Sequence, residues 1–487
     1  MEGPHLWIVA CDIRAFILAA LIVVAYIIIP WFNCKLRLGK LPTVETNEGA
    51  EEWRKTYLQS ASKLYRDGYH KFKDQIWVMP TSDGRKNVVV PGRFLPELNK
   101  LPEMVLSFPA AIKKIARLSP ILNQEIRDVL KNEIPACEDW TPVFIFPKLV
   151  KVIAQVSGRI FVGSELCHDK DYLDTAINYT TELIDAMKAI KRMNPWLRPF
   201  LASRLPQVQR VNEREELAVK FFEPIVQARR EAAKNPDYQK PDDMLQWFLN
   251  RSDQCKSQSL RHIVKMQLLM IFAGIHNTTV TTTNILYNLA VTPDYIPPLR
   301  EEIQTVIGDN GGVLTSRALQ QLEKLDSYMK ETLRFHPPEI TSFSRQAVGG
   351  ITLSNGQYIP SGSFIETPAH AIYQDNATFP DSDTFDGFRF YKIRQGGSAA
   401  LGARNQFVTS NEQNLVFGYG KHACPGRFLA AAEIKMILSK ILLEYDFKVV
   451  GDETKRYQNY ELGRVVSTAK ALTYPNGQLN RDRLYLK

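Results

Sequence analysis

The segment Phe417–Gly426, which reads F-G-Y-G-K-H-A-C-P-G, carries the residues best suited to chemistry. Its three glycines let the backbone turn tightly and approach a flat, bulky group. Cys424 stands before Pro425, at the start of a helix predicted over Gly426–Tyr445, whose first N–H groups would stabilise a thiolate. A thiolate held in this way suits an axial ligand of iron. The alternative is an unreactive buried cysteine, a common fate for a lone cysteine.

This segment resembles the heme-binding motif of the cytochrome P450 family, F-x-x-G-x-R/H-x-C-x-G. The matching positions are Phe417, Gly420, His422, Cys424 and Gly426. The resemblance implies that Cys424 is the axial ligand of heme iron, that Phe417 packs against the cysteine loop and that His422 contacts a heme propionate. Most relatives have arginine in place of His422, so this contact would be weaker and sensitive to pH. A zinc site at His422 and Cys424 is an alternative, but no second pair of ligands lies near in the sequence.

Further charged residues stand in the order that this family shows. Glu331 and Arg334 lie three positions apart on a predicted helix, so they share one face and can pair. With Arg389 they resemble the family's Glu-Arg-Arg triad, which implies a structural charge network behind the heme. Arg345 matches the family's second propionate-binding position. Each arginine could instead be a solvated surface charge.

The segment Met266–Leu289 predicts a buried helix that becomes polar in its middle. Relatives read A/G-G-x-D/E-T-T, and here A-G-I-H-N-T stands in that frame. The resemblance implies that Gly274 opens a groove for dioxygen, with Asn277 in the usual threonine position and Thr278 next to it, both flanking the groove. Either could donate a hydrogen bond to dioxygen, and His276, in place of the usual acid, could relay protons. Alternatively, these groups only hydrogen-bond helix carbonyls.

The I-H pair in that frame is similar to filamentous-fungal oxidases of diterpenes, including those of gibberellin and indole-diterpene pathways. Sequences similar to those of these oxidases also occur at residues 88–103, 156–163, 299–303 and 385–391. Pocket-lining residues are expected to include Ala273 and Ile340–Phe343, which are apolar or small. They favour a bulky lipophilic substrate, a terpenoid first of all, although a polyketide or an indole hybrid fits the same description.

One element of the family is missing from its usual place. Many relatives use an early W-x-x-x-R element against the propionates, but the only literal match, Trp247 to Arg251, falls too late in the chain. Lys131 or Arg127 could substitute for it.

The segment Ala15–Phe32 predicts a membrane anchor. It holds no charged residue and approaches the roughly 20 residues that one helix needs to span a bilayer. Lys35, Arg37 and Lys40 follow it, so the positive-inside bias places the later chain in the cytosol. We expect a lumenal segment 1–14, a single-pass anchor 15–32 in the endoplasmic reticulum membrane, a basic linker 33–50 and a cytosolic catalytic domain 51–487. A cleaved signal peptide is disfavoured because no small-residue cleavage site follows; a buried core helix is the other alternative.

The sequence of residues 51–487 predicts a mainly α (α+β) fold in one unit, with a large helical part and small β-sheets. The resemblance to P450 proteins implies the same fold. Helical spacing dominates residues 51–333, including 210–234. After the double proline at 337–338, Asn355-Gly356 predicts a hairpin within 351–365. Residues 396–414 are expected to form a loop.

Composition sets broad limits on the function. The 487 residues are 45% hydrophobic and 23% charged, which indicates a globular protein and excludes collagen-like and disordered chains. The six cysteines are scattered without a C-x-x-C pair, so they indicate neither a disulfide scaffold nor a zinc site. The net charge of +9 shows no long run of one sign and argues against a nucleic-acid partner.

These motifs predict a heme-thiolate monooxygenase that inserts one atom of O₂ into a lipophilic secondary metabolite. The resemblance implies electrons from NADPH through a reductase, whose acidic surface would meet Lys421, Arg427 and Lys435. Asn277 motivates a second hypothesis, a heme-thiolate enzyme for a non-oxygenating oxidation, cyclisation or isomerisation. A third is a membrane-tethered helical scaffold in which Cys424 is inert.

Overall fold

The structure is a computed structural model that describes residues 36–44, 49–82, 84, 86–96, 122–194, 196–255, 259–451, 454–467 and 483–487. Residues 122–133 are helical, and the labelled helices are α2 (Ala50–Lys71), α5 (Ile145–Phe161), α6 (Lys170–Arg192), α7 (Arg198–Leu201), α8 (Pro206–Ala232), α9 (Met244–Cys255), α10 (Leu260–Val291), α11 (Ile296–Asp309), α12 (Ser316–Gln321), α13 (Glu323–Phe335), α14 (Ala369–Tyr373), α15 (Arg389–Gln395), α16 (Ala399–Arg404) and α17 (Arg427–Glu444). The strands are β1 (Trp77–Pro80), β2 (Lys86–Val89), β3 (Thr141–Phe144), β4 (Ser342–Gln346), β5 (Ile351–Thr352), β6 (Tyr358–Ile359), β7 (Phe364–Thr367), β8 (Phe447–Val449), β9 (Tyr460–Leu462), β10 (Val465–Ser467) and β11 (Arg483–Leu486).

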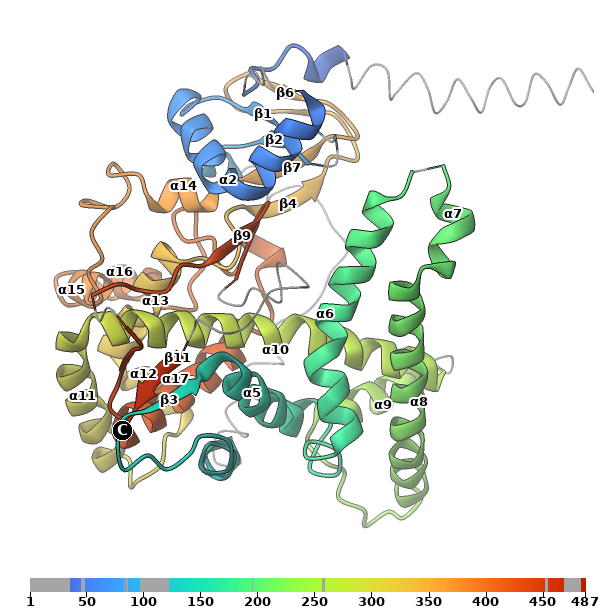
Figure 1. Ribbon diagram of the computed structural model, residues 1–487, viewed down its shortest axis with the longest axis vertical. Helices are drawn as coiled ribbons and strands as arrows, with labels where there is room; N and C mark the ends of the chain where they lie inside the picture. Colours follow the sequence, from blue (N-terminus) through green and yellow to red (C-terminus); the bar gives the residue numbers. More distant parts are fainter. Residues whose placement is uncertain are drawn as a thin grey trace, which may run out of the picture.

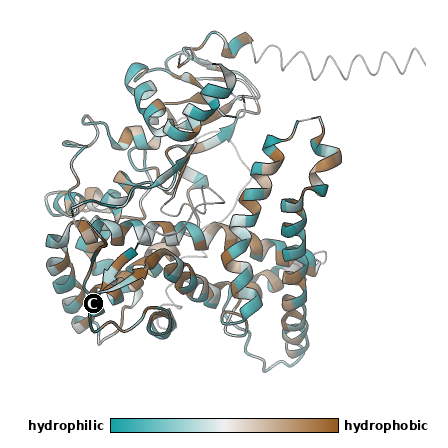
Figure 2. Cartoon of the chain, viewed as in Figure 1, coloured by the Kyte–Doolittle hydropathy of each residue, from teal (hydrophilic) through white to brown (hydrophobic). Residues whose placement is uncertain are grey.

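Helix α10 is the central element of the helical body. The Ser259 side chain caps its first turn by accepting a hydrogen bond from the His262 backbone N–H. Its apolar residues then pack against α5, α6, α8, α13 and α17, and it runs across the middle of the molecule in Figure 1. Hydrophobic residues colour much of α5, α10 and α17 in Figure 2. Burial of most of its surface explains why its sequence is largely apolar on both sides of a polar middle.

The four-stranded sheet has the order β1-β2-β7-β4 and joins two distant parts of the chain. Strand β2 lies parallel to β7, with Val88 opposite Ile365, and the other neighbours are antiparallel. Helical spacing dominates residues 51–333 as predicted, but the hairpin of β1 and β2 lies within this range and had no signal in the sequence. Short β-branched runs such as residues 88–90 have no periodicity that separates a buried strand from a buried helix.

Most local predictions after residue 200 are confirmed. Strands β5 and β6 form the expected hairpin, and Gly356 adopts a φ of +79° in its turn. Helix α8 contains the predicted segment 210–234 apart from its end, and α17 begins at Arg427 as expected. The sequence predicts a loop over residues 396–414, but in the structure they include α16. The Ser398 side chain caps this helix.

The predicted anchor 15–32 lies outside the described residues. Within the described ranges, only α10 has the length and composition that a membrane span needs, and 56% of its most apolar window is buried. Its position at the centre of the helical body accounts for that apolar character.

Candidate heme-thiolate site

The cysteine loop is held by its own backbone and by aromatic contacts. The Cys424 N–H donates to the Phe417 carbonyl oxygen at 2.6 Å, which closes the loop. Gly418 and Gly420 adopt φ values of +76° and +64°, a region that favours glycine. The Phe417 ring packs edge-on against Phe407 with centroids 5.3 Å apart. The loop therefore presents the cysteine in a fixed orientation.

Cys424 lies at the start of α17 and is an exposed residue in the described structure. The residue as a whole is exposed, but the surrounding loop still partly desolvates the sulfur. Burial raises the pKa of this thiol, whereas the backbone N–H groups of Gly426 and Arg427 and the Arg427 charge lower it. These donors are arranged to stabilise negative charge on sulfur, as a metal-bound thiolate requires.

Strand β4, which carries Arg345, packs directly against the cysteine loop. The Ser342 hydroxyl donates to the Leu415 carbonyl oxygen at 2.8 Å. The Phe343 ring meets Tyr419 of the loop with centroids 6.3 Å apart. Arg345 is half-buried, stacks on Phe343 and donates to the Ser344 carbonyl oxygen. The structure thus joins the segments of Arg345 and Cys424, which lie far apart in the sequence.

Helix α10 has one open face in an otherwise buried surface. Leu269, Ala273 and Asn277 are exposed and recur every four residues, so they form one stripe. The Asn277 Nδ2 donates to the Ala273 carbonyl oxygen at 3.2 Å, while Thr278 is only 6% exposed. Asn277 thus lies on the open face of α10 and Thr278 in the packed core, because adjacent helix positions point about 100° apart. That the two residues flank one groove for dioxygen stays a prediction.

The threonines after Asn277 follow a common pattern from which Thr278 departs. The hydroxyls of Thr279, Thr281, Thr282 and Thr283 each donate to the carbonyl four residues earlier. The Thr278 hydroxyl makes no such bond with any described residue. Asn277 therefore bonds a helix carbonyl, as the alternative predicted, through one of its amide N–H groups. Thr278 does not, and it is a buried residue.

His276 and Gly274 face helices that cover α10. The His276 Nε2 lies 2.9 Å from the Ile177 carbonyl oxygen of α6, and burial lowers the pKa of its imidazole. His276 is therefore neutral and turned toward α6 near neutral pH. A Cβ at Gly274 would lie 3.0 Å from the Phe161 ring, so a side chain there would press on α5.

The three residues of the predicted charge network come together in the structure. Glu331 has no exposed side-chain surface, and it accepts hydrogen bonds from Arg334 at 2.8 Å and from Arg389 at 3.2 Å. Arg334 also donates to the carbonyl oxygens of Tyr373 and Ser382 at 2.6 and 2.8 Å. The triad thereby ties α13 to α15 and to the segment that precedes it.

Residues 82–474 match the cytochrome P450 family. The cytochrome P450 monooxygenase ATR3 of Stachybotrys chlorohalonatus is 36% identical over 422 residues, which cover 80% of this chain and 88% of the relative. The cytochrome P450 monooxygenase TES1 of Alternaria alternata is 36% identical over 467 residues, covering 92% and 90%. This chain belongs to the cytochrome P450 family. It is therefore a monooxygenase, an oxidoreductase, and the resemblance predicted from the cysteine loop is confirmed.

The family implies a heme, and the residues of this P450 fit such a group. Cys424 is an exposed residue whose sulfur has the backbone N–H groups of Gly426 and Arg427 beside it. The exposed stripe of α10 includes Leu269, which is 49% exposed on the most central helix. Helices in a protein core usually bury their leucine side chains. The exposed Leu269 side chain is therefore suited to contact a bulky apolar ligand.

The structure contradicts one residue of the predicted reductase surface. Lys435 is 5% exposed, and its Nζ lies 2.6 Å from Asp326 Oδ1 and donates to the Leu319 carbonyl oxygen at 2.9 Å. It lies in the third turn of α17, which faces α12 and α13, so the helix buries it. Lys421 is exposed, and Arg427 is half-buried and donates to the Cys424 carbonyl oxygen at 2.8 Å.

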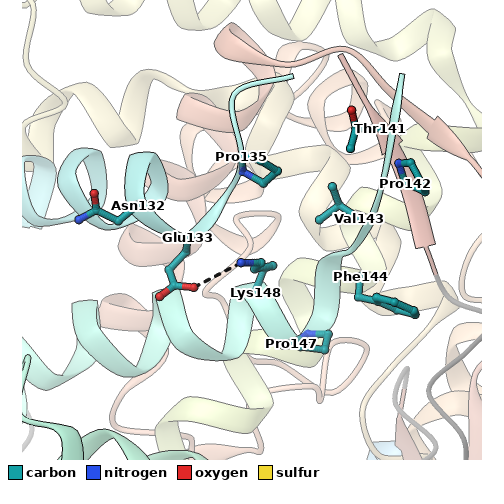
Figure 3. A pocket seen from close by; sticks show the side chains of 9 residues that line it. All are labelled: Asn132, Glu133, Pro135, Thr141, Pro142, Val143, Phe144, Pro147 and Lys148. Atoms are coloured by element: carbon teal, nitrogen blue, oxygen red, sulfur yellow. Dashed lines mark ion pairs between the residues drawn. The ribbon is translucent and has the colours of Figure 1, made fainter. Parts of the chain in front are cut away.

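The remaining candidates are dispersed. Arg127 and Lys131 are exposed on helix 122–133, and Trp247 bonds Asp242 at the start of α9. Ala273 is open, but three of the four residues 340–343 are buried. A separate hollow of about 590 Å³ lies by β3 and the start of α5, where Lys148 and Glu133 pair at 3.7 Å (Figure 3). It shares no residue with the cysteine loop or with α10.

Two features of the site had no signal in the sequence. Phe343 adopts a φ of +56°, which is unusual for a bulky residue and allows its contact with Tyr419. Asp326 binds Lys435, Arg394 and the Phe407 N–H together, and thereby braces the segment before the cysteine loop. Both depend on partners distant in the chain, which a local pattern does not reveal.

Proposed function

We propose that this P450 is a membrane-anchored heme-thiolate monooxygenase that inserts one oxygen atom of O₂ into a terpenoid-like secondary metabolite. The open stripe of α10 carries this proposal, because an exposed Leu269 and Ala273 beside a polar Asn277 suit an apolar substrate near a proton-handling group. A bound heme would supply the activation of dioxygen, with thiolate donation that favours O–O cleavage.

The residues of the chain would divide the work. Cys424 would hold the iron, while Arg345 and His422 would contact the heme propionates. Asn277 would orient oxygen and water through its amide, since its second N–H and its oxygen have no described partner. The triad of Glu331, Arg334 and Arg389 would keep the proximal segments rigid.

We assign electron delivery to a reductase that uses NADPH and docks near Lys421. This exposed lysine follows the loop glycines, and the net charge of +9 favours association with an acidic surface. Lys435 has no part in this surface.

Membrane association is supported by an apolar tip on the helical body. Trp196 and Phe200 are 85% and 74% exposed at α7, and Leu197 lies between them. Arg198 lies within this tip and the exposed Arg204 follows it, and such a combination of apolar and basic residues suits the interface of an anionic bilayer. In Figure 1, α7 lies toward the same end of the molecule as residues 36–44, which follow the predicted anchor.

The test is turnover of a terpenoid panel by the full chain with its reductase under ¹⁸O₂. We expect product masses that carry one ¹⁸O per oxidation. Products without label would favour the alternative, a non-oxygenating oxidation, cyclisation or isomerisation, which Asn277 in the threonine position motivates. The reduced protein with CO should show the band of a thiolate-ligated heme, and retention of that band by Cys424→Ser would overturn the ligand assignment.

A further inference from the structure

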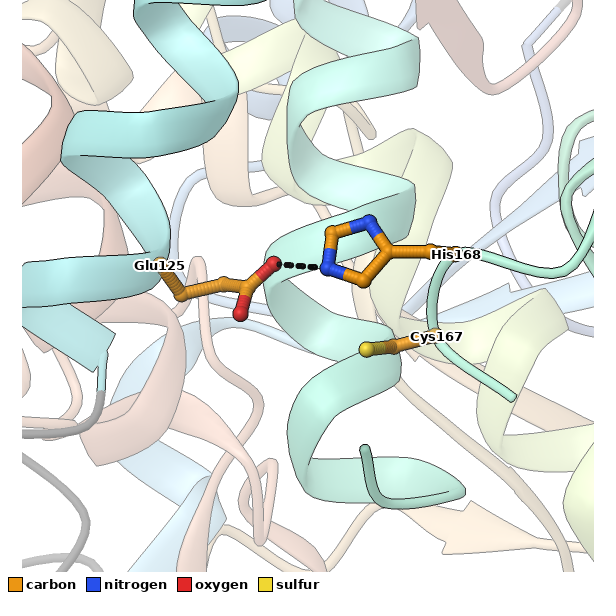
Figure 4. A group of neighbouring side chains, drawn as sticks. All are labelled: Glu125, Cys167 and His168. Atoms are coloured by element: carbon orange, nitrogen blue, oxygen red, sulfur yellow. Dashed lines mark ion pairs between the residues drawn. The ribbon is translucent and has the colours of Figure 1, made fainter. Parts of the chain in front are cut away.

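A second group of metal-ligating side chains lies away from the cysteine loop of the heme site. Glu125 on helix 122–133 and the adjacent pair Cys167 and His168, before α6, bring one ligand atom each to within 4.8 Å of one another. The His168 Nε2 lies 2.9 Å from Glu125 Oε1, and the Cys167 sulfur points at the same space (Figure 4). Such spacing is close to the separations between ligands around one tetrahedral zinc ion, whose bonds are about 2.0–2.3 Å.

The carboxylate is oriented for a cation. The Glu125 side chain is 12% exposed, and its Oε1 is buried without a hydrogen-bond donor of acceptable geometry among the described residues. A carboxylate taken out of water in this way needs a positive partner. His168 can serve as a partner only when it is protonated, whereas a metal ion would use both the carboxylate and the neutral imidazole.

The thiol is held in place from two sides. Cys167 is 1% exposed, and its sulfur lies 3.9 Å from the Ser164 carbonyl oxygen. A Cβ at Gly158 of α5 would lie 3.3 Å from the Cys167 Cβ, so α5 packs closely on this residue. After the pair, Asp169 caps α6 by accepting from the Tyr172 N–H, which fixes where the loop ends. The loop is therefore preorganised.

We propose that Glu125, Cys167 and His168 bind one zinc ion. The donor set of sulfur, imidazole nitrogen and carboxylate oxygen is typical of zinc among biological divalent ions. On binding, the thiol S–H bond breaks, its proton leaves to water and a Zn–S bond forms, so two negative ligands neutralise the ion. His168 is 57% exposed, which admits a hydrated ion and leaves water as the fourth ligand.

The zinc would connect helix 122–133 to the junction of α5 and α6. Burial, followed by the charge of Glu125, raises the pKa of the Cys167 thiol to about 11, so without a cation this thiol is protonated. A zinc ion reverses that preference because it binds thiolate. The positive charge of Arg159 also lowers the pKa of the Cys167 thiol, as a zinc ion would.

Zinc binding is tested on the full-length heme-loaded protein after dialysis against a chelator. We expect about one zinc per heme after addition of ZnCl₂ and gel filtration, measured by mass spectrometry of the metals. Absorption at the zinc K-edge should show one sulfur and otherwise nitrogen or oxygen ligands, and the heme does not contribute to that signal. Cys167→Ser and Glu125→Gln should each weaken binding about tenfold or more.

His168→Asn keeps the test decisive if the buried variants do not fold, because His168 is mostly exposed. It should retain heme and the CO band but lose zinc. Cys137→Ser is the matched control, since Cys137 is a free cysteine outside the cluster, and it should bind zinc like wild type. Three results would overturn the proposal. These are wild-type protein that binds no zinc, bound zinc that has no sulfur ligand, and His168→Asn protein that binds zinc as well as wild type. None of these outcomes depends on substrate turnover, so they remain separate from the proposed oxygenation.

Discussion

Arg334 forms a two-pronged ion pair with Glu331, in which Nε lies 2.8 Å from Oε2 and Nη2 lies 2.8 Å from Oε1. Both side chains are almost completely buried, at 3% and 0% exposure. Arg389 binds the same carboxylate, and the Asp386 N–H donates to it at 3.1 Å. One carboxylate therefore satisfies two guanidinium groups and a backbone donor.

Replacement of this carboxylate should destabilise the protein severely. Glu331→Gln removes the charge and leaves two buried arginines without an anion, so we expect the free energy of unfolding to fall by about 3–5 kcal/mol. Denaturant unfolding measures this change, and CO difference spectra should show less heme-loaded protein. Glu231→Gln is the control because Glu231 pairs with Lys234 at the surface, where the pair contributes little. Equal stability of the two variants would refute a structural role for the triad.

Substitutions at Lys435 should lower stability, whereas substitutions at Lys421 should weaken binding of the reductase. Lys435→Met breaks a buried pair with Asp326 and should lower the unfolding free energy by about 3 kcal/mol or more, with the KM for reductase unchanged. Lys421→Ala should raise the KM for reductase a few-fold and weaken its dependence on salt, with little change in stability. Titration of reductase at several ionic strengths, together with unfolding curves, measures both. A larger reductase KM in Lys435→Met alone would contradict this division.

Asn277 and Thr278 should differ in their effect on catalysis. Asn277→Ala removes the amide from the open stripe, and we expect product formed per NADPH consumed to fall about tenfold or more, with more hydrogen peroxide. Thr278→Val keeps the shape of a buried side chain and should leave this ratio within about twofold. The measurement is parallel quantification of product, NADPH and peroxide. The reverse ranking of the two variants would assign the role to Thr278.

Glu433 should make stability depend on pH. It is fully buried on α17, where the Ser157 hydroxyl donates to both carboxylate oxygens at 2.9 and 3.0 Å. Burial raises its pKa from 4.5 to about 8, although the Ser157 hydrogen bond lowers it. Between these two values the folded protein keeps a proton that the unfolded chain has released. Stability from this group is therefore present below the unfolded pKa and is lost as the pH rises toward 8.

Glu433→Gln removes this titration while it preserves the hydrogen bond with Ser157. We expect the variant to gain on the order of 1–3 kcal/mol over wild type at pH 8 and much less at pH 5. Denaturant unfolding at both pH values measures the difference. Glu444→Gln, near the exposed end of the same helix, should follow wild type at both values. A parallel pH dependence in Glu433→Gln and wild type would show that the carboxyl does not titrate in this range.

The sequence alone determined those features whose physical basis is local. The turn chemistry of the cysteine loop, the hairpin at Asn355-Gly356 and the i,i+3 pair of Glu331 and Arg334 each depend on neighbours along the chain. The resemblance of these motifs to those of the P450 family predicted the family, which is confirmed, while the role of Cys424 as the iron ligand stays a prediction.

Only the tertiary structure decided which of these side chains are accessible and which distant ones meet. It placed Asn277 on the open face of α10 and Thr278 in the core, although they are adjacent in the sequence. It buried Lys435 against Asp326, and it brought Glu125 to Cys167 and His168. The physical reason is that the packing of separate helices sets burial, desolvation and long-range contacts, and these do not follow from the spacing within one segment.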